Sequence, residues 1–272
     1  MNKFSIRSTL NLTGFQLRNS KKTIIGWTIA IMGIMSLYMF LFPTMKDIAE
    51  VKMETMPEEI MSLFGMEDLS SMNNYIGYFG MIYNIILIPL SIFGAIFGAG
   101  LVYKEEKNKT IEFINSMPVK RSEIYLANII TGIIGLTIVL IGAIAVVGIA
   151  GIAVGGNTFD LMDYITVSKV SSITPYFFMF VAIGIAGMTA KINVPVIASM
   201  VVLADYMVGY LGKLLEEKIP HLSSFSPFEV FNPAKVVDLD NELIVQAVIY
   251  LAIGLIFMIL GKTIYNKRDL KL

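Results

Sequence analysis

The sequence predicts an all-α integral membrane protein with six transmembrane helices and both termini in the cytoplasm. Hydrophobic residues make up 56% of the 272 residues and charged residues only 15%, which lies outside the usual composition of soluble domains. Six apolar stretches are each long enough to cross a hydrocarbon core of about 30 Å. Since no linker or low-complexity segment interrupts them, we expect residues 1–272 to form a single transmembrane domain.

The first two predicted spans cover residues 23–42 and 75–103. Before the first, apolar and basic residues alternate, which fits either an amphipathic helix on the membrane surface or a frayed tail; the late apolar run is not typical of a signal peptide. The second span is longer than a straight crossing needs, so we expect it to tilt, with a kink at Pro89. Gly94 and Gly98 have the spacing that lets another helix approach closely, and we favour packing within the chain over a subunit interface.

The third predicted span covers residues 124–150, and we expect its helix to break in the glycine-rich stretch 148–156. An external loop with two acids follows, and then the fourth and fifth spans at residues 171–190 and 194–211. An external segment with three prolines, in which we expect short helical structure, leads to the sixth span. The sixth span covers residues 243–261.

The charges are distributed unevenly between the two sides of this topology. Fifteen of the 21 Lys and Arg residues fall in the four segments on the side of the termini, and fifteen of the 21 acids fall in the three opposite segments. By the positive-inside rule both termini lie in the cytoplasm. We therefore expect a multi-pass protein of the plasma membrane, bacterial in type. The net charge of zero gives no reason to expect a nucleic-acid partner.

The residues needed for catalysis or metal binding are scarce. The chain has no cysteine and one histidine, His221, which we interpret as a surface residue, so we predict no metal site and no catalytic residue. Gly261-Lys262-Thr263 is similar to the end of a phosphate-binding loop, but it terminates an apolar helix and lacks the first glycine. We therefore expect no cofactor on this chain and interpret the lysine as a membrane-surface anchor.

Three polar residues lie within predicted spans. Asp205 is the one ionisable residue in the body of a span, and we weigh an interfacial position against a cation or proton site. Asn84 and Asn128 are expected to form hydrogen bonds between helices and could line a polar pathway. An ATP-independent secondary transporter or channel that uses Asp205 is the alternative function.

The stretch 103–123 is the one strongly charged segment between two long uncharged ones. Ile111, Ile114 and Met117 recur in it at helical spacing, which indicates a short amphipathic helix with an apolar contact to make. Glu105-Glu106 also resembles the paired acids of an intramembrane metalloprotease, but Thr110 occupies the position where that family has arginine. We therefore interpret the acidic pair as a solvated charge cluster.

The order of these features resembles the permease subunits of type-2 ABC exporters. An apolar span, paired acids, a threonine, a short helix, Pro-Val, a basic pair and another apolar span follow one another, and residues 226–233, SPFEVFNP, are also similar to that family. Lys109 and Asn128 depart from its usual glycine and lysine.

The resemblance implies that the stretch between spans two and three is a cytoplasmic coupling helix that docks on a separate ATPase subunit. The residues it assigns to docking are Glu105, Glu106, Thr110, Ile111, Ile114, Met117, Pro118, Lys120 and Arg121. It further implies two ATPase copies that hold ATP and Mg²⁺, and a second permease that is either identical or homologous. The expected function is ATP-driven export of an amphipathic or hydrophobic substrate, such as a peptide, a drug or a lipid-like compound, with no ATP hydrolysis on this chain.

Overall fold

The structure is a computed structural model, and it describes residues 5–52, 73–107, 119–189, 192–216, 218–236 and 241–267. Within these ranges the chain is helical without strands, and six helical stretches are long and apolar enough to cross a membrane. They are α1 (Ile6–Phe40), α4 (Tyr75–Lys107), α6 (Arg121–Val154), α7 (Leu161–Ser171) with α8 (Ile173–Met188), α9 (Val194–Leu214) and α11 (Asn241–Lys267). The predicted all-α fold with six spans is confirmed.

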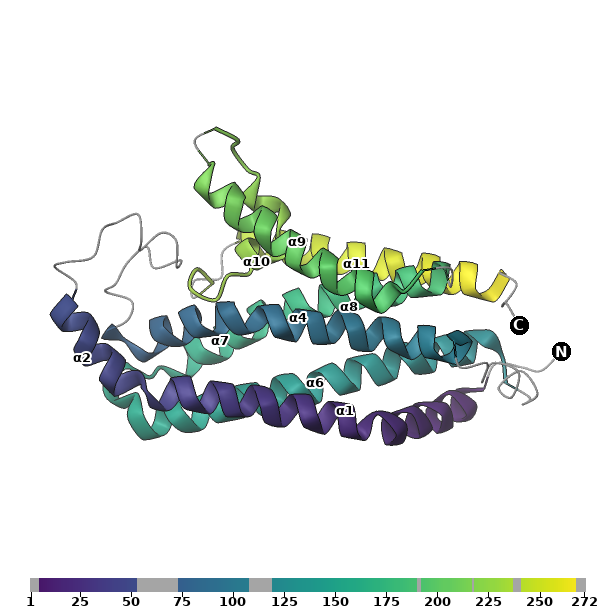
Figure 1. Cartoon of the computed structure of the whole chain (residues 1–272), viewed down its shortest axis with the longest axis horizontal. Helices are drawn as coiled ribbons and strands as arrows, with labels where there is room; N and C mark the ends of the chain where they lie inside the picture. The colour runs from purple at the N-terminus through teal and green to yellow at the C-terminus, as the bar shows by residue number, and fades with distance from the viewer. Residues whose placement is uncertain are drawn as a thin grey trace.

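The shorter elements connect these helices. α2 (Phe42–Lys52) follows α1 directly, the 3₁₀ turn η2 (Gly156–Thr158) joins α6 to α7, and η3 (Ser223–Phe225) and α10 (Pro227–Val230) lie between α9 and α11. The last two confirm the short helical structure expected between the fifth and sixth spans. Both chain ends lie at the same end of the bundle (Figure 1), as an even number of crossings requires.

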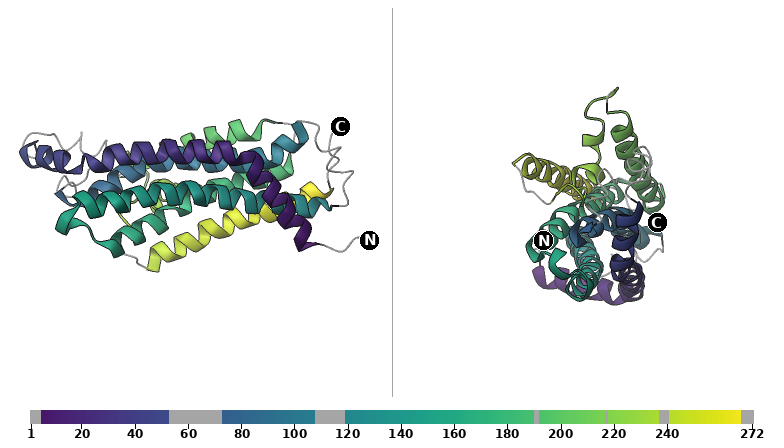
Figure 2. Two further views of the ribbon diagram at one scale, coloured as in Figure 1. Left: turned by 90° about the horizontal axis from the view of Figure 1, so that it is seen from below. Right: turned by 90° about the vertical axis from the view of Figure 1, so that its left-hand side faces the viewer.

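Two boundaries differ from the sequence prediction. α1 begins at Ile6, so the basic segment before the first span is helical and continuous with it, although it runs at an angle to the rest of α1 (Figure 2). The loop expected after the third span is instead the helix α7, because Asp160 caps it through hydrogen bonds from the backbone N–H groups of Met162 and Asp163, at 2.7 and 3.0 Å. α6 does end in the glycine-rich stretch, at Val154, with Gly155 as its C-cap residue.

α4 and α8 form the centre of the bundle, and their spans are the most buried. α1 packs on α6, α9 packs on α4, and α11 packs on α8. Seen from the end, α9 and α11 lie on one side of the centre and α1 and α6 lie on the other (Figure 2). α1, α9 and α11 therefore present most of the apolar surface that faces outwards.

The two glycines of the predicted close-packing motif face α8. A Cβ atom on Gly94 would lie 2.9 Å from the backbone oxygen of Pro175, and one on Gly98 would lie 2.8 Å from the side chain of Met179. The interpretation that they serve packing within the chain is confirmed. Pro89 lies inside α4, which continues on both sides of it.

Candidate functional site: a pocket between α1, α4 and α9

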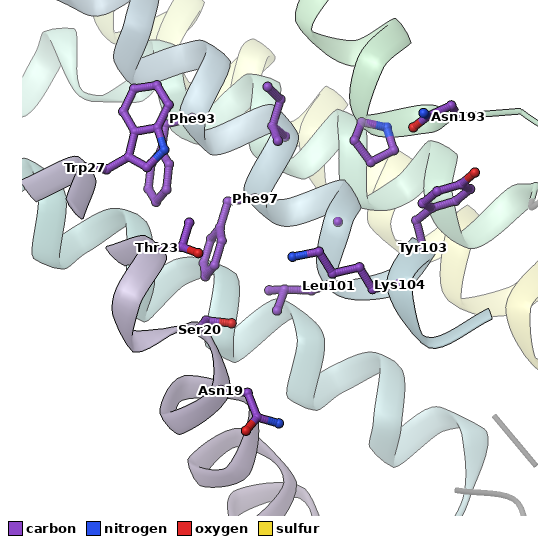
Figure 3. Close-up of a pocket in the computed structure, with 13 residues that line it drawn as sticks. Asn19, Ser20, Thr23, Trp27, Phe93, Phe97, Leu101, Tyr103, Lys104 and Asn193 are labelled. Atoms are coloured by element: carbon purple, nitrogen blue, oxygen red, sulfur yellow. The ribbon is translucent and has the colours of Figure 1, made fainter. Parts of the chain in front are cut away.

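A pocket of about 290 Å³ opens between α1, α4 and the start of α9, near the end of the bundle where the termini lie (Figure 3). α1 and α9 flank α4 from different sides, and α1 touches α4 only sparsely. The pocket occupies the space that this sparse contact leaves. Its volume is close to the lower limit for small-molecule sites, which are typically 300–1,000 Å³.

One wall of the pocket is aromatic. The rings of Trp27 on α1 and Phe93 on α4 lie 5.2 Å apart between centroids, and Phe93 is stacked on Phe97 at 5.2 Å with an angle of 14°. Phe93 and Phe97 lie four residues apart and so share one face of α4. Gly135 on α6 leaves space for the Phe97 ring, because a Cβ atom on residue 135 would lie 2.9 Å from Cζ of that ring. These rings offer a flat apolar surface to a ligand.

The other end of the pocket is polar. Asn19, Ser20 and Thr23 enter it from α1, and Asn193 enters it from the start of α9 (Figure 3). Lys104 is the one charged residue among the described residues of its lining, and no described residue pairs with it. The pocket thus combines an aromatic wall with hydroxyl, amide and ammonium groups, which is the pattern expected for binding a molecule that has a polar end and an apolar end.

The sequence did not single out these pocket residues. Trp27, Phe93 and Phe97 read as ordinary span residues, and only the fold brings the three helices together. The spacing of Thr23 and Trp27 on α1 and of Phe97 and Lys104 on α4 does place each pair on one helix face, but nothing in the sequence says that the two faces meet.

A second polar cluster joins α1 to α6. The side-chain amide of Gln16 donates a hydrogen bond to Oδ1 of Asn128, and Oγ1 of Thr131 donates to Oε1 of Gln16 at 2.9 Å. Asn128 and Thr131 are fully buried. The interhelical bond predicted for Asn128 is confirmed, although its partner was not foreseen. The sequence feature that could have indicated Gln16 as this partner is a row of polar residues on one face of α1, in which Thr9 and Thr13 precede Gln16 at helical spacing.

Asp205 on α9 lies outside the pocket, toward the end of the bundle opposite the termini. It is partly buried, and its Oδ2 accepts a hydrogen bond of 2.8 Å from the fully buried Ser226. One turn further along α9, Gly209 packs closely against Ser226 and Glu229, and Glu229 pairs with Lys235 at 3.6 Å. Asp205 therefore helps to hold the segment around α10 against α9.

Asn84 does not make the bond that was expected of it through its side-chain oxygen. That oxygen is buried and has no hydrogen-bond partner among the described residues. The sequence showed that Asn84 lies within the second span, but it could not show which side chains lie next to it.

The comparison with protein families identifies the kind of transporter. A family model for the C-terminal domain of the multidrug efflux system permease Rv1217c matches residues 11–265. The chain belongs to this family. A search of curated proteins found no match. The resemblance to an exporter permease is thereby confirmed, and the six helices agree with a multi-pass membrane protein in which this chain is a transport subunit.

The docking residues that the permease resemblance assigned lie only partly within the described structure. Glu105 and Glu106 belong to the last turn of α4, without a description of their side chains, and residues 110–118 lie outside the described residues. Lys120 and Arg121 start α6. Their docking role remains a prediction.

Glu123, two residues further on, is buried and fixes the start of α6 in this efflux permease. Its carboxylate accepts hydrogen bonds from the backbone N–H of Lys120 at 3.1 Å and from the backbone N–H of Ser5 at 2.7 Å. The first bond is half of a capping box. The start of α6 is thus tied to the start of α1.

The alternative chemistries weighed on the sequence gain no support from the fold of the permease. Gly261, Lys262 and Thr263 lie inside α11, which agrees with the interpretation of this stretch as part of an apolar helix. His221 is exposed, as predicted. Among the described residues no group of three His, Cys, Asp or Glu side chains could hold a metal ion.

Proposed function

We propose that this chain is the membrane subunit of an ATP-driven exporter. Two copies of a separate ATPase subunit, which hold ATP and Mg²⁺, would dock on the cytoplasmic side, and a second permease, identical or homologous, would complete the pathway. The observation that carries the proposal is the match of residues 11–265 to a multidrug efflux permease. The membrane is the plasma membrane of a bacterium, with both termini inside.

The position of the docking segment supports this arrangement. α4 ends and α6 begins at the end of the bundle where both termini lie (Figure 1), which is also the end with the excess of Lys and Arg. An ATPase on that side would meet Ile111, Ile114 and Met117 on the connection between the two helices. A push on this connection would reach both α4, which lines the pocket, and α6, which holds α1.

The pocket is the place in the described structure where a substrate would first contact the permease. It lies at the same end as the docking segment, and its aromatic wall and polar end suit an amphipathic substrate. Its small volume favours one apolar chain or one ring system at a time.

The test is to measure association with the cognate ATPase and substrate-stimulated ATP hydrolysis in proteoliposomes. Ile114→Asp and Met117→Asp place a charge on the predicted apolar face, and we expect each to abolish association while the permease stays folded. Ser116→Asp is the matched control, since it adds the same charge about 160° away from the centre of that face. Normal coupling in the first two variants would refute the docking role.

The competing function is transport without ATP, driven by an ion at Asp205. The hydrogen bond from Ser226 to Asp205 favours a structural role for this carboxylate. Substrate efflux in proteoliposomes that hold the permease and a proton gradient but no ATPase would support the competing function, and we expect none.

A further inference from the structure

We propose that the pocket between α1, α4 and α9 selects a single-chain anionic amphiphile, with its head group at Lys104 and its apolar chain against Trp27 and Phe93. This inference rests on the proposed function, because it names the substrate class of the same pocket. The family description does not specify the charge of the substrate. We infer an anion, since the charge of the lining favours anions over cations.

The charge argument starts from the lining. Among the described residues of the lining, Lys104 is the one that carries a charge, and none is an acid. A shallow groove continues from Thr23 and Trp27 over α1 to Lys22, which adds a second cation nearby. Glu123, a buried acid at this end of the bundle, already accepts hydrogen bonds from two backbone N–H groups. A cationic head would therefore meet like charge without a compensating carboxylate among the described residues, whereas an anionic head would gain a charge-assisted contact.

The dimensions point to one apolar chain. From Phe93 to Lys104 α4 rises about 16 Å, which is roughly half of a 30 Å hydrocarbon core. An amphiphile that lies along this face would keep its head at the membrane surface and its chain within one leaflet. A volume of about 290 Å³ is too small for the two chains of a phospholipid, and a single chain would fill it.

The arrangement of the side chains fixes the direction of the ligand. Trp27 and Phe93 are in contact at the apolar end, and Asn19, Ser20 and Lys104 lie away from them, nearer the start of α1 and the end of α4 (Figure 3). The Lys104 side chain reaches into the pocket from the end of α4. A ligand in the opposite orientation would place its charge among aromatic rings and its chain among hydroxyl and amide groups, which is unfavourable at both ends.

The chain carries its own probe, because Trp27 is the one tryptophan in the sequence and it lines the pocket. Bromine quenches indole fluorescence on contact. The purified permease, without ATPase, is titrated with 12-bromododecanoate, 2-bromododecanoate and 12-bromododecyltrimethylammonium. We expect saturable quenching by the first, weak quenching by the second, whose bromine is next to the carboxylate, and an apparent Kd about tenfold higher for the third.

Lys104→Gln should raise the apparent Kd of 12-bromododecanoate about tenfold and remove the difference between the anionic and the cationic probe. Lys262→Gln, which changes an exposed lysine of α11, is the matched control and should leave both values unchanged. Added salt should weaken binding of the anion to the unaltered permease because Lys104 is exposed.

Equal affinity for the anion and the cation, or an unchanged Kd in Lys104→Gln, would overturn the proposal. Stronger quenching by the 2-bromo probe would overturn the orientation. Since the assay contains neither ATPase nor ATP, selective binding without ATP-driven efflux would leave the pocket assignment standing and refute the exporter. Efflux without selective binding would refute the pocket assignment alone.

Discussion

Two helix contacts in the bundle, α8 with α11 and α1 with α4, differ in how closely the helices approach each other. Where α8 meets α11, the backbones touch: a Cβ atom on Gly184 would lie 2.5 Å from the backbone oxygen of Phe257, and one on Gly261 would lie 2.6 Å from the backbone oxygen of Gly184. Where α1 passes α4, the contact is sparse and a pocket opens. α1 packs instead along α6, with a polar link at Gln16, and α9 packs on α4, with a polar link to the α10 segment.

This difference determines how far the helices at each contact can move relative to one another. Helices in a membrane gain little from the hydrophobic effect between them, so close backbone approach and interhelical hydrogen bonds hold them together. The α8–α11 contact uses close backbone approach, which leaves no space and tolerates no shift. α1 and α4 touch only sparsely, so the space between them can widen or narrow with few contacts to break, while α1 stays packed on α6 and α9 stays packed on α4.

The largest effect is expected on the tightly packed side. Gly184→Ala places a methyl group against the Phe257 backbone, which cannot rotate away as a side chain could, so we expect the permease to lose about 1–3 kcal/mol of stability. Thermal unfolding in detergent measures this loss. Gly33→Ala on α1 is the matched control, because nothing lies within 4 Å of its added Cβ atom. Equal melting temperatures for the two variants would mean that α8 and α11 are not packed through this glycine.

Sequence reasoning succeeded for the features that depend on local pattern. Span length and charge placement predicted six helices in the right places, because each span must satisfy its own backbone hydrogen bonds in lipid. The α8–α11 contact could not be predicted, since Gly184 and Gly261 belong to different helices and no sequence motif indicates that the two glycines meet. The α7 helix was missed because its charged residues resembled those of a loop, while its buried residues, Tyr164 and Val167, become visible only in the fold.

The candidate site was predictable only in parts for the same reason. Asn128 was recognised because a polar residue in a span needs a partner, but Gln16 was treated as part of a surface or frayed segment and its role was missed. The pocket depends on three helices that lie far apart in the sequence, and its residues are of types that also face lipid. The predicted docking face, residues 110–118, could be proposed only from the family resemblance and lies outside the described residues.

A smaller effect is expected at the link that holds α1. Gln16→Leu would remove the hydrogen bonds that Gln16 makes to the buried Asn128 and Thr131, and we expect a loss of about 1 kcal/mol, within the range of interhelical hydrogen bonds in membranes. Unfolding of Gln16→Leu, Asn128→Leu and the double variant forms a cycle that isolates the pair. Gln246→Leu is the control, since that glutamine bonds to Glu242 within its own helix. Strict additivity in the cycle would show that the two side chains do not interact.

The smallest effect is expected for Asp205→Asn, at the polar link between α9 and the α10 segment. Asp205→Asn keeps a side-chain oxygen that can accept the hydrogen bond from Ser226, so we expect a stability change below about 0.5 kcal/mol and normal efflux. Asp205→Leu removes the acceptor and leaves the buried hydroxyl unpaired, which should cost about 1–2 kcal/mol. Thermal unfolding and reconstituted efflux of both variants separate a structural bond from an ion site. Stable Asp205→Asn protein without efflux would show that transport uses the charge of Asp205, and the polar link on α9 would then belong to the transport mechanism and not to the scaffold around the pocket.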